Sequence, residues 1–312
     1  MDYGNGISVI DSGYHRPGLA AFYLMRQGDQ AAFIDTGTAH SLPHALAALR
    51  ANGLAPEQVA YVIPTHVHLD HAGGAGAMMR QFPNAKLVVH PRGARHLIDP
   101  TKLAAGVAEV YGAAQAEKSF GTLIPIPAER VIEAPDEFAL DFNGRPLLFL
   151  DTPGHARHHF CVVDQNSYSI FTGDTFGISY REFDTENGAF IFPTTTPVQF
   201  EPAALHTSID RIVAHDPRQI LLTHFGRVTE SARLAAQMHL LIDAFAELAL
   251  DVKNAGAQRH QRLIDGQRTI LLRALRTHRS YLGDAEIDSI LEMDLELNAQ
   301  GMEVWLDRST ED

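Results

Sequence analysis

The chain has 312 residues, a length that fits one large α/β domain with an appendage or two ordinary domains. Its composition, 45% hydrophobic and 20% charged, is that of a globular protein, and no window approaches a transmembrane run of apolar residues. A formal net charge of −13 argues against a nucleic-acid substrate, because proteins that hold phosphate backbones display a basic field.

The compartment is predicted from the start of the chain and from its cysteine content. Residues 1–6 carry no basic region followed by an apolar stretch, so no secretory signal is expected. Cys161 is the only cysteine, which excludes an internal disulfide and fits a reducing compartment. We therefore expect a cytoplasmic protein without membrane or nucleic-acid partners, and we interpret Cys161 as a buried small hydrophobe.

The first two-thirds of the chain alternates short apolar runs with Gly, Pro and Asp turns and with segments of helical period. Several runs are continuous, as expected for a sheet covered on both faces. The predicted strands are Ile7–Ile10, Ala21–Arg26, Ala31–Asp35, Tyr61–Thr65, Lys86–His90, Pro146–Leu150, Phe160–Val163, Ser167–Thr172 and Ile220–Thr223. The predicted helices are Ser41–Ala51, Ala72–Gln81, about Pro100–Ala116 and Pro202–Ala214. Two stretches, Tyr111–Val131 and Phe176–Gln199, are expected to be irregular.

From Thr229 to about Asn298 the pattern is almost wholly helical. Apolar residues recur there at alternating spacings of four and three, namely Leu234, Met238, Leu241, Phe245, Leu248 and Val252. We interpret this stripe as packing against the rest of the chain; a homodimer interface and a lid are the alternatives. The predicted organisation is one domain over residues 1–228 and a helical appendage over residues 229–312.

The strongest motif is a run of ligand-type side chains between a predicted strand and a predicted helix. It reads Thr65-His66-Val67-His68-Leu69-Asp70-His71-Ala72-Gly73-Gly74. A buried imidazole or carboxylate needs a partner, and four packed together would repel one another without a cation between them. We expect His66 and His68 to reach one metal ion and Asp70 and His71 to reach another. Surface histidines gathered by chance are the alternative.

Three more candidate ligands each follow an apolar strand. They are His155, after the turn 152–154, Asp174, after the run 168–172, and His224, after the run 220–223. Each is weak alone, because a histidine after a strand is usually a loop residue. Since α/β sheets open their clefts at the carboxyl ends of strands, the shared position predicts one common site.

With these residues identified, the sequence resembles the metallo-β-lactamase superfamily over about residues 7–227. The resemblance rests on Ile34-Asp35-Thr36-Gly37, the His-x-His-x-Asp-His core, Thr-Pro-Gly-His, Thr-Gly-Asp-Thr and the final His224. It implies an αββα sandwich with a dinuclear site in its open edge. By this resemblance His66, His68 and His155 would bind the first metal ion, Asp70, His71 and His224 the second, and Asp174 would bridge them. The bridging Asp174 makes the site similar to glyoxalase II and lactonase-type members.

Two divalent ions in this ligand set would leave the site with a charge of about +1 once Asp70, Asp174 and a bridging hydroxide are subtracted. That hydroxide would attack a carbonyl, and Asp70 would orient it and later help to protonate the leaving group. The sequence therefore predicts a metal-dependent hydrolase acting on a small ester, thioester or lactone, with Asp70 as the catalytic residue. Zinc is the predicted metal, with iron and manganese as alternatives.

Other functions use similar ligands. Phosphodiester hydrolysis is one alternative, although the acidic composition disfavours nucleic-acid versions. An iron-dependent redox enzyme is another, and a non-catalytic metal-binding module is a third, disfavoured because all seven ligand positions are filled.

Contacts to the substrate are predicted only as candidates. Tyr180, Arg181 and Arg227 are candidates for holding a polar or anionic acyl group, although a surface position is the more common role of such residues. His159, four residues after His155, is interpreted either as an orienting partner of a ligand or as a structural histidine. The Gly-Arg signature of glyoxalase II is missing, and Gly177 stands where lactonases carry a tyrosine, so the substrate of neither group is carried over.

Overall fold

The computed structural model describes residues 1–196 and 199–308. Residues 197 and 198, in the predicted irregular stretch Phe176–Gln199, and residues 309–312, at the end of the predicted appendage, lie outside the described residues. The chain divides into two compact units. The first unit consists of Met1–Asp151, His158–Gly173 and Gln219–Arg227, and the second unit of Thr152–Arg157, Asp174–Arg218 and Val228–Asp312.

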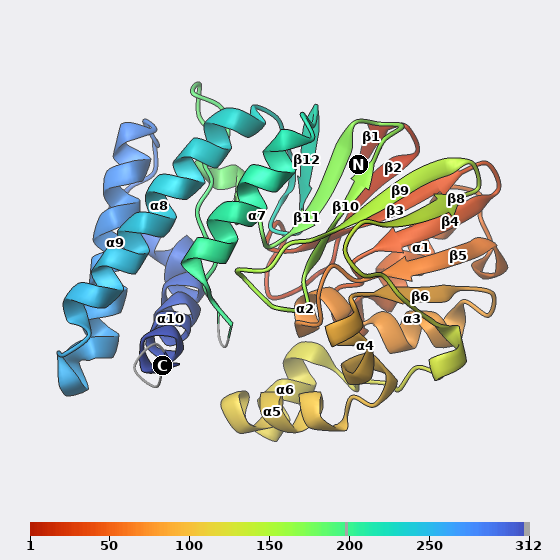
Figure 1. Ribbon diagram of the computed structural model, residues 1–312, viewed down its shortest axis with the longest axis horizontal. Coiled ribbons are helices and arrows are strands. Elements are labelled where there is room, and N and C mark those ends of the chain that lie inside the picture. The colour runs from red at the N-terminus through yellow and green to blue at the C-terminus, as the bar shows by residue number, and fades with distance from the viewer. Residues whose placement is uncertain (197–198, 309–312) are drawn as a thin grey trace. The chain divides into compact units, whose positions relative to one another are not determined.

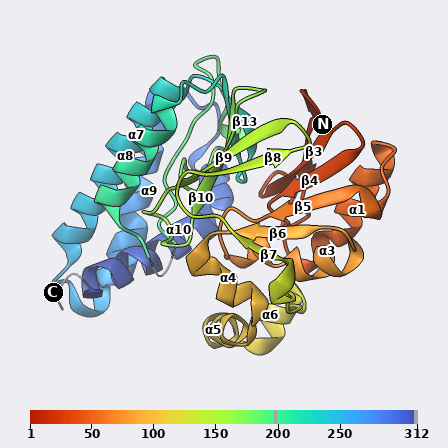
Figure 2. The same cartoon turned by 45° about the vertical axis from the view of Figure 1, so that its right-hand side comes forward.

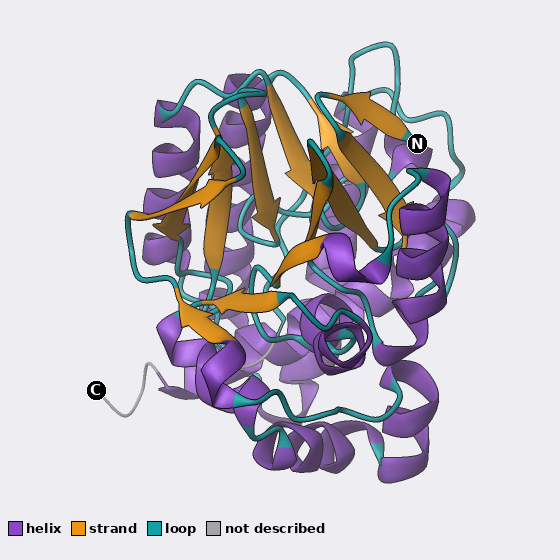
Figure 3. Cartoon of the chain, turned by 90° about the vertical axis from the view of Figure 1, so that its right-hand side faces the viewer, coloured by secondary structure: helices purple, strands orange, loops and turns teal. Residues whose placement is uncertain are grey.

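Two mixed β-sheets form the first unit (Figures 1 and 3). The first sheet has the order β1-β2-β3-β4-β5-β6-β7, antiparallel from β1 to β4 and parallel from β4 to β7. Its strands are β1 (Asp2–Gly4), β2 (Ile7–Asp11), β3 (Ala21–Gln27), β4 (Gln30–Ile34), β5 (Val59–Ile63), β6 (Lys86–Val89) and β7 (Val131–Glu133).

The second sheet has the order β13-β12-β11-β10-β9-β8. Its strands are β8 (Phe138–Phe142), β9 (Arg145–Asp151), β10 (Phe160–Asp164), β11 (Ser169–Gly173), β12 (Gln219–Leu222) and β13 (Gly226–Val228). Apolar side chains from both sheets form one shared buried cluster, which includes Tyr23, Ile34, Phe149, Phe171 and Leu221. Strands β10 and β11 are buried along their whole length, which explains their continuous apolar sequences, whereas β8 alternates between less and more exposed residues.

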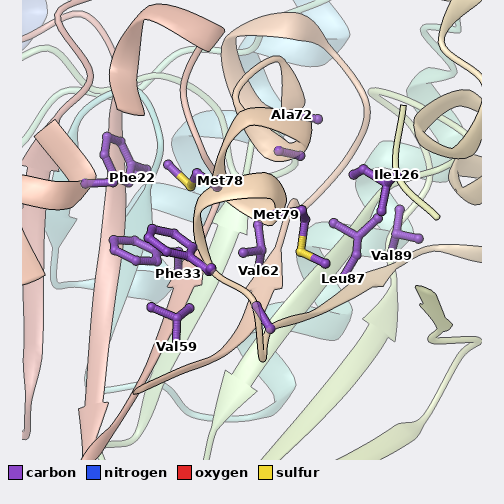
Figure 4. Close-up of a cluster of buried hydrophobic side chains, with 14 of the residues drawn as sticks. Phe22, Phe33, Val59, Val62, Ala72, Met78, Met79, Leu87, Val89 and Ile126 are labelled. Carbon is purple, nitrogen blue, oxygen red and sulfur yellow. The ribbon is translucent and has the colours of Figure 1, made fainter. Parts of the chain in front are cut away.

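Helices cover the outer face of the first sheet (Figure 2). The helices of the first unit are α1 (Leu42–Ala51), α2 (Leu69–Ala72), α3 (Ala75–Gln81), α4 (Pro91–Ile98), α5 (Thr101–Tyr111) and α6 (Ala113–Phe120). Figure 4 shows Met78 and Met79 of α3 beside Phe33 and Val62 of the sheet. The expected αββα fold is confirmed as two mixed sheets with flanking helices, followed by C-terminal helices.

The nine predicted strands are present, and the differences lie in the helices and in the shortest strands. The predicted helix Ala72–Gln81 is interrupted at Gly73 and Gly74. The predicted irregular stretch Tyr111–Val131 is wrong over residues 113–120, which form α6 after a break at Gly112, where φ is +79°. A glycine in this conformation ends one helix and starts another, which hides the helical period from a sequence window.

The second unit contains four long helices, namely α7 (Pro202–Ala214), α8 (Ser231–Val252), α9 (Arg259–Thr277) and α10 (Asp284–Arg308). Five of the six residues in the predicted apolar stripe of α8 are buried within the chain, so the stripe has its partner there. The helices also bond to the segment 176–196, since Gln237 donates to the carbonyl of Ile191 at 2.7 Å. Among the described residues, no helix is long and apolar enough to cross a membrane.

Candidate metal centre

The central ligand motif follows β5 and runs into α2. His66 precedes α2 (Leu69–Ala72), His68 is its N-cap residue in an extended conformation, and Asp70 and His71 lie within its single turn. A Cβ atom on Gly74 would lie 2.7 Å from the carbonyl oxygen of Thr38 and 2.8 Å from that of Thr36. The backbones approach closely at this glycine, because a side chain on any other residue would force the segments apart.

Asp70, His71 and His224 converge in the first unit. Their ligand atoms all lie within 4.8 Å of one another. His224 Nε2 is 3.2 Å from Asp70 Oδ2, and His71 Nε2 is 3.6 Å from the same oxygen. In a tetrahedral zinc site with bonds of about 2.0–2.2 Å, neighbouring ligand atoms are about 3.3 Å apart. The spacing of these three side chains fits one metal ion.

The other ring nitrogens of these two histidines determine their tautomers. His71 Nδ1 lies 2.9 Å from Asp35 Oδ2, and His224 Nδ1 lies 2.8 Å from the carbonyl oxygen of Leu19. Both partners are acceptors, so each Nδ1 carries the hydrogen and each Nε2 presents a lone pair toward Asp70. Two imidazole lone pairs and a carboxylate oxygen then face one another, an arrangement that a cation stabilises.

Asp35 is the residue whose role the sequence reasoning missed. Its buried carboxylate accepts from Thr65 N at 2.7 Å, Thr65 Oγ1 at 2.9 Å and Thr223 Oγ1 at 2.6 Å, in addition to His71. It stands directly after β4 with a φ of +58°, a conformation that aspartate tolerates better than most residues. The signal used for the other candidates, a polar side chain after an apolar strand, also applies to Asp35.

His66 and His68 form the second part of the motif. Thr65 donates its hydroxyl hydrogen to Asp35, so its oxygen is the acceptor for His66 Nδ1 at 3.2 Å. This leaves His66 Nε2 as a lone pair, 2.9 Å from His68 Nδ1. The ring of the fully buried His159 stacks on His66 with centroids 4.9 Å apart. His159 is thus beside a proposed ligand, and its role as an orienting partner stays a prediction.

His155 and Asp174 lie together in the second unit. His155 Nε2 is 3.4 Å from Asp174 Oδ2, and both side chains are buried. His155 Nδ1 is 3.3 Å from the carbonyl oxygen of Thr194, which again leaves Nε2 with the lone pair. As with His71 in the first unit, the Nε2 atom of His155 faces an aspartate while its Nδ1 atom bonds to an acceptor. The acceptor here is a backbone carbonyl, whereas that of His71 is the carboxylate of Asp35.

Helix α10 supports the carbonyl behind His155. Asn298 Oδ1 accepts from Thr195 N at 2.7 Å, and Thr195 Oγ1 donates to the carbonyl oxygen of Asn298 at 2.9 Å. A Cβ atom on Gly301 would lie 1.5 Å from the carbonyl oxygen of Thr195, so the helix backbone meets this segment directly. The position of the acceptor for His155 therefore depends on Asn298 and Gly301, which are 143 and 146 residues after His155 in the sequence.

The predicted substrate contacts have other partners. Tyr180 is buried, and its hydroxyl donates to Asp294, 3.1 Å from either oxygen. Arg181 pairs with Asp184 at 3.2 Å, and the guanidinium of Arg227 lies over the ring of Tyr3 at 4.8 Å. These contacts give all three residues a structural role within their own units. Cys161 is buried, as predicted.

Two further histidines of the first unit have defined surroundings. His90 bonds to Asp151 at 3.1 Å and accepts from Arg92 N at the start of α4, so it acts as a helix cap. His15, which the sequence reasoning passed over, stands in the loop between β2 and β3. Burial lowers the pKa of His15, and the negative charge of Asp70 partly opposes this shift. His15 therefore lies within electrostatic range of Asp70.

Comparisons with known proteins agree with this geometry. A family model described as the metallo-beta-lactamase superfamily matches residues 15–224. The metallo-beta-lactamase fold-containing protein ST1585 of Sulfurisphaera tokodaii is 27% identical over 221 residues, or 68% of this chain and 75% of that protein. Its crystal structure has a TM-score of 0.64 at 23% identity, with 96% of this chain and 98% of that chain covered, which supports the fold.

Two relatives carry names that describe an activity. The atrochrysone carboxyl ACP thioesterase of Aspergillus fumigatus is 28% identical over 156 residues, which cover 49% of this chain and 38% of that protein. The acyl-coenzyme A thioesterase MBLAC2 of Bos taurus is 26% identical over 203 residues, which cover 55% of this chain and 63% of that protein.

Proposed function

Because the chain belongs to the metallo-beta-lactamase superfamily, we propose that it is a metal-dependent hydrolase that cleaves a small acyl thioester. The observation that carries the proposal is the convergence of His71 Nε2 and His224 Nε2 on Asp70, with both imidazoles held from behind by acceptors. The thioester is favoured over an ester or a lactone because two relatives are named as thioesterases.

The proposed ligand set has seven residues and two divalent ions. His66, His68 and His155 would hold the first ion, Asp70, His71 and His224 would hold the second, and Asp174 would serve both. Nitrogen and carboxylate donors of this kind suit zinc, and each of four histidines has its second ring nitrogen near an acceptor that fixes the tautomer. The assignment to the glyoxalase II and lactonase-like branch rests on Asp174 and belongs to the proposal.

When bound, the metal pair supplies positive charge that lowers the pKa of water and stabilises the oxyanion. Asp70 is the acid–base residue because its side chain is 21% exposed, whereas His71 is fully buried. Hydrolysis adds one water across the C–S bond and gives a carboxylic acid and a thiol. Asp70 holds the proton that the water releases and returns it to the departing thiolate.

An apolar groove in the first unit is suited to the acyl chain. It has a volume of about 440 Å³ and runs between α5 and α6. Its apolar lining consists of Leu69, Pro100, Ala104, Val107, Ala108, Ala113, Ala116, Phe120, Leu123 and Pro125. Leu69 stands between the candidate ligands His68 and Asp70, so a chain bound in the groove ends beside the motif. We propose a thioester with an unbranched apolar acyl group as the substrate.

Metal analysis combined with a substrate panel tests the function. We expect about two zinc ions per chain and turnover of acyl thioesters that exceeds turnover of lactones and of bis-p-nitrophenyl phosphate. Preferred cleavage of the phosphodiester would replace the proposal with phosphodiesterase activity. Oxygen consumption by an iron-loaded protein would favour a redox enzyme, and metal binding without any turnover a binding module.

Replacing the proposed catalytic residue tests its role separately from the fold. Asp70→Ala should lower kcat by about 10³-fold, because both a ligand and the proton carrier are lost, while the melting temperature of the metal-free protein stays close to that of the wild type. Retention of most of the wild-type turnover would refute the assigned role.

The groove is tested by changing one alanine that lines it. Each added methylene of an acyl chain should raise kcat/KM by up to about fourfold until the groove is filled. Ala108→Phe should remove this dependence and leave short-chain turnover unchanged. Ala105→Phe, on the exposed side of the same helix, is the matched control and should behave as the wild type. Equal chain-length profiles for both variants would exclude the groove as the acyl site.

A further inference from the structure

Two histidine–aspartate pairs face each other on α7 and α8, outside the candidate metal centre. His206 and Asp210 are one turn apart on α7, and His239 and Asp243 are one turn apart on α8. The two helices run side by side within the second unit (Figures 1 and 2). The imidazole rings stack with centroids 4.8 Å apart and an interplanar angle of 19°.

The hydrogen bonds of these side chains cross between the helices. His206 Nε2 lies 2.9 Å from Asp243 Oδ1, and His239 Nε2 lies 3.0 Å from Asp210 Oδ1. A carboxylate is an acceptor only, so each Nε2 carries a hydrogen and each Nδ1 has a lone pair. The two Nδ1 atoms are 2.5 Å apart. Two lone pairs at this distance repel each other, so the rings either share a proton, as the short distance allows, or move apart around a metal ion.

We propose that His206 and His239 form a second metal site, which binds one divalent transition-metal ion such as zinc or nickel through their Nδ1 atoms. Asp210 and Asp243 orient the imidazoles, the arrangement of carboxylate, histidine and metal that strengthens the ligand. The two carboxylates carry two negative charges, which a divalent ion balances and a shared proton does not. The site is separate from the proposed hydrolytic centre and does not depend on its function.

The exposure of the pair fits an ion that enters from solvent. The side chains of His206 and His239 are 26% and 27% exposed, so water completes the coordination shell without a large desolvation penalty. Binding requires the two nitrogens to separate to about 3.3 Å, the tetrahedral spacing. This is a shift of less than about 1 Å for stacked rings on neighbouring helices, within the range of a small change in side-chain torsions.

The bound ion links α7 to α8 only in the folded chain, so it raises the melting temperature. A hundredfold excess of free ion over Kd should shift Tm upward by several degrees. The full-length protein, with its candidate centre already loaded with zinc, is titrated with Ni²⁺ as the probe. Bound nickel is measured by equilibrium dialysis, and Tm is measured at each concentration.

The wild type should bind about one more nickel ion per chain than His206→Gln or His239→Gln, with micromolar affinity. The double variant Asp210→Asn and Asp243→Asn should bind nickel about 10- to 100-fold more weakly, because the imidazoles lose their orienting partners. His215→Gln changes an exposed histidine at the end of α7 and is the matched control, which should retain wild-type binding.

Three results would overturn the proposal. The first is equal nickel binding and equal Tm gain in the wild type and in His206→Gln. The second is binding by the wild type only at millimolar nickel. The third is a Tm that nickel does not change but that depends on pH through one titrating proton, with this pH dependence absent in His239→Gln. That result would mean that the two imidazoles share a proton only. If a histidine variant does not fold, the Asp210→Asn and Asp243→Asn protein provides the same comparison.

Discussion

In the first unit the ring of His71 donates to a buried carboxylate, Asp35, whereas in the second unit the ring of His155 donates to a backbone carbonyl, that of Thr194. A carboxylate orients the ring and also makes the imidazole a stronger ligand through its charge. A carbonyl orients the ring without charge and is only as fixed as the segment that carries it. The first arrangement depends on electrostatics, and the second on packing.

The two arrangements also differ in what supports them. Asp35 is held by Thr65 and Thr223, which lie just after strands β5 and β12 of the first unit. Thr194 is held indirectly by Asn298 and Gly301 of α10. We infer that α10 positions the acceptor behind His155, and that residues of the sandwich position the acceptor behind His71.

Deleting residues 229–312 should have the largest effect. The truncated chain still encodes all seven proposed ligands, but it loses α8, whose Met238 approaches Gly177 closely, and Asn298. The segment 176–196 then exposes apolar surface, so we expect an insoluble or aggregating product. Expression, sedimentation and size-exclusion chromatography measure this outcome. A soluble, monomeric and fully active truncation with unchanged substrate preference would show that the appendage is dispensable.

Asp35→Asn should have the next largest effect. Asparagine tolerates the positive φ of Asp35, so the substitution changes charge and acceptor number rather than the backbone. The amide cannot accept from His71, Thr65 and Thr223 together, and we expect a loss of about 3 kcal/mol in unfolding free energy. Metal affinity should fall by about 10- to 100-fold, measured by chelator competition.

Asp164→Asn is the matched control for this substitution. Asp164 is also fully buried in the first unit, but it pairs with Arg145 at 2.5 Å and does not contact the proposed ligands. Its replacement should destabilise the protein by a similar amount and leave metal affinity unchanged. If both variants lose metal equally, the role of Asp35 is only structural, and the contrast between the two units is wrong.

The sequence allowed the ligand candidates to be predicted because their signals are local. A motif of six residues and the polar side chains after apolar strands need no knowledge of distant contacts. The role of Asp35 was missed because its partners Thr65 and Thr223 are 30 and 188 residues away. Tyr180 was only a candidate for contacting the substrate, and nothing nearby in the sequence indicates that its hydroxyl donates to Asp294, 114 residues later.

Gly301→Ala should have a smaller effect, confined to the second unit. The new methyl group displaces the carbonyl of Thr195, and we expect a loss of about 2 kcal/mol in unfolding free energy. Because Thr194 moves with it, metal affinity should fall by about tenfold. Gly106→Ala, also in a helix but with open space around its Cβ, is the control and should stabilise by about 0.5–1 kcal/mol. Unchanged metal affinity in Gly301→Ala would separate α10 from the proposed centre.

The smallest expected effect is a pH-dependent contribution of His260 to the anchoring of α10. Hydrogen bonding to Glu303 at 2.9 Å, with a further contribution from Glu296, raises the pKa of His260 above its ordinary value of 6.5. A raised pKa stabilises the folded state below pH 6.5, and this contribution is lost as the pH rises through the raised value. The groups are partly exposed, so the contribution is below about 1 kcal/mol.

His260→Gln should therefore lower the unfolding free energy in urea more at pH 6 than at pH 8.5, with a difference that shrinks in high salt. An equal loss at both pH values would mean that His260 holds α10 by packing alone, as Gly301 does.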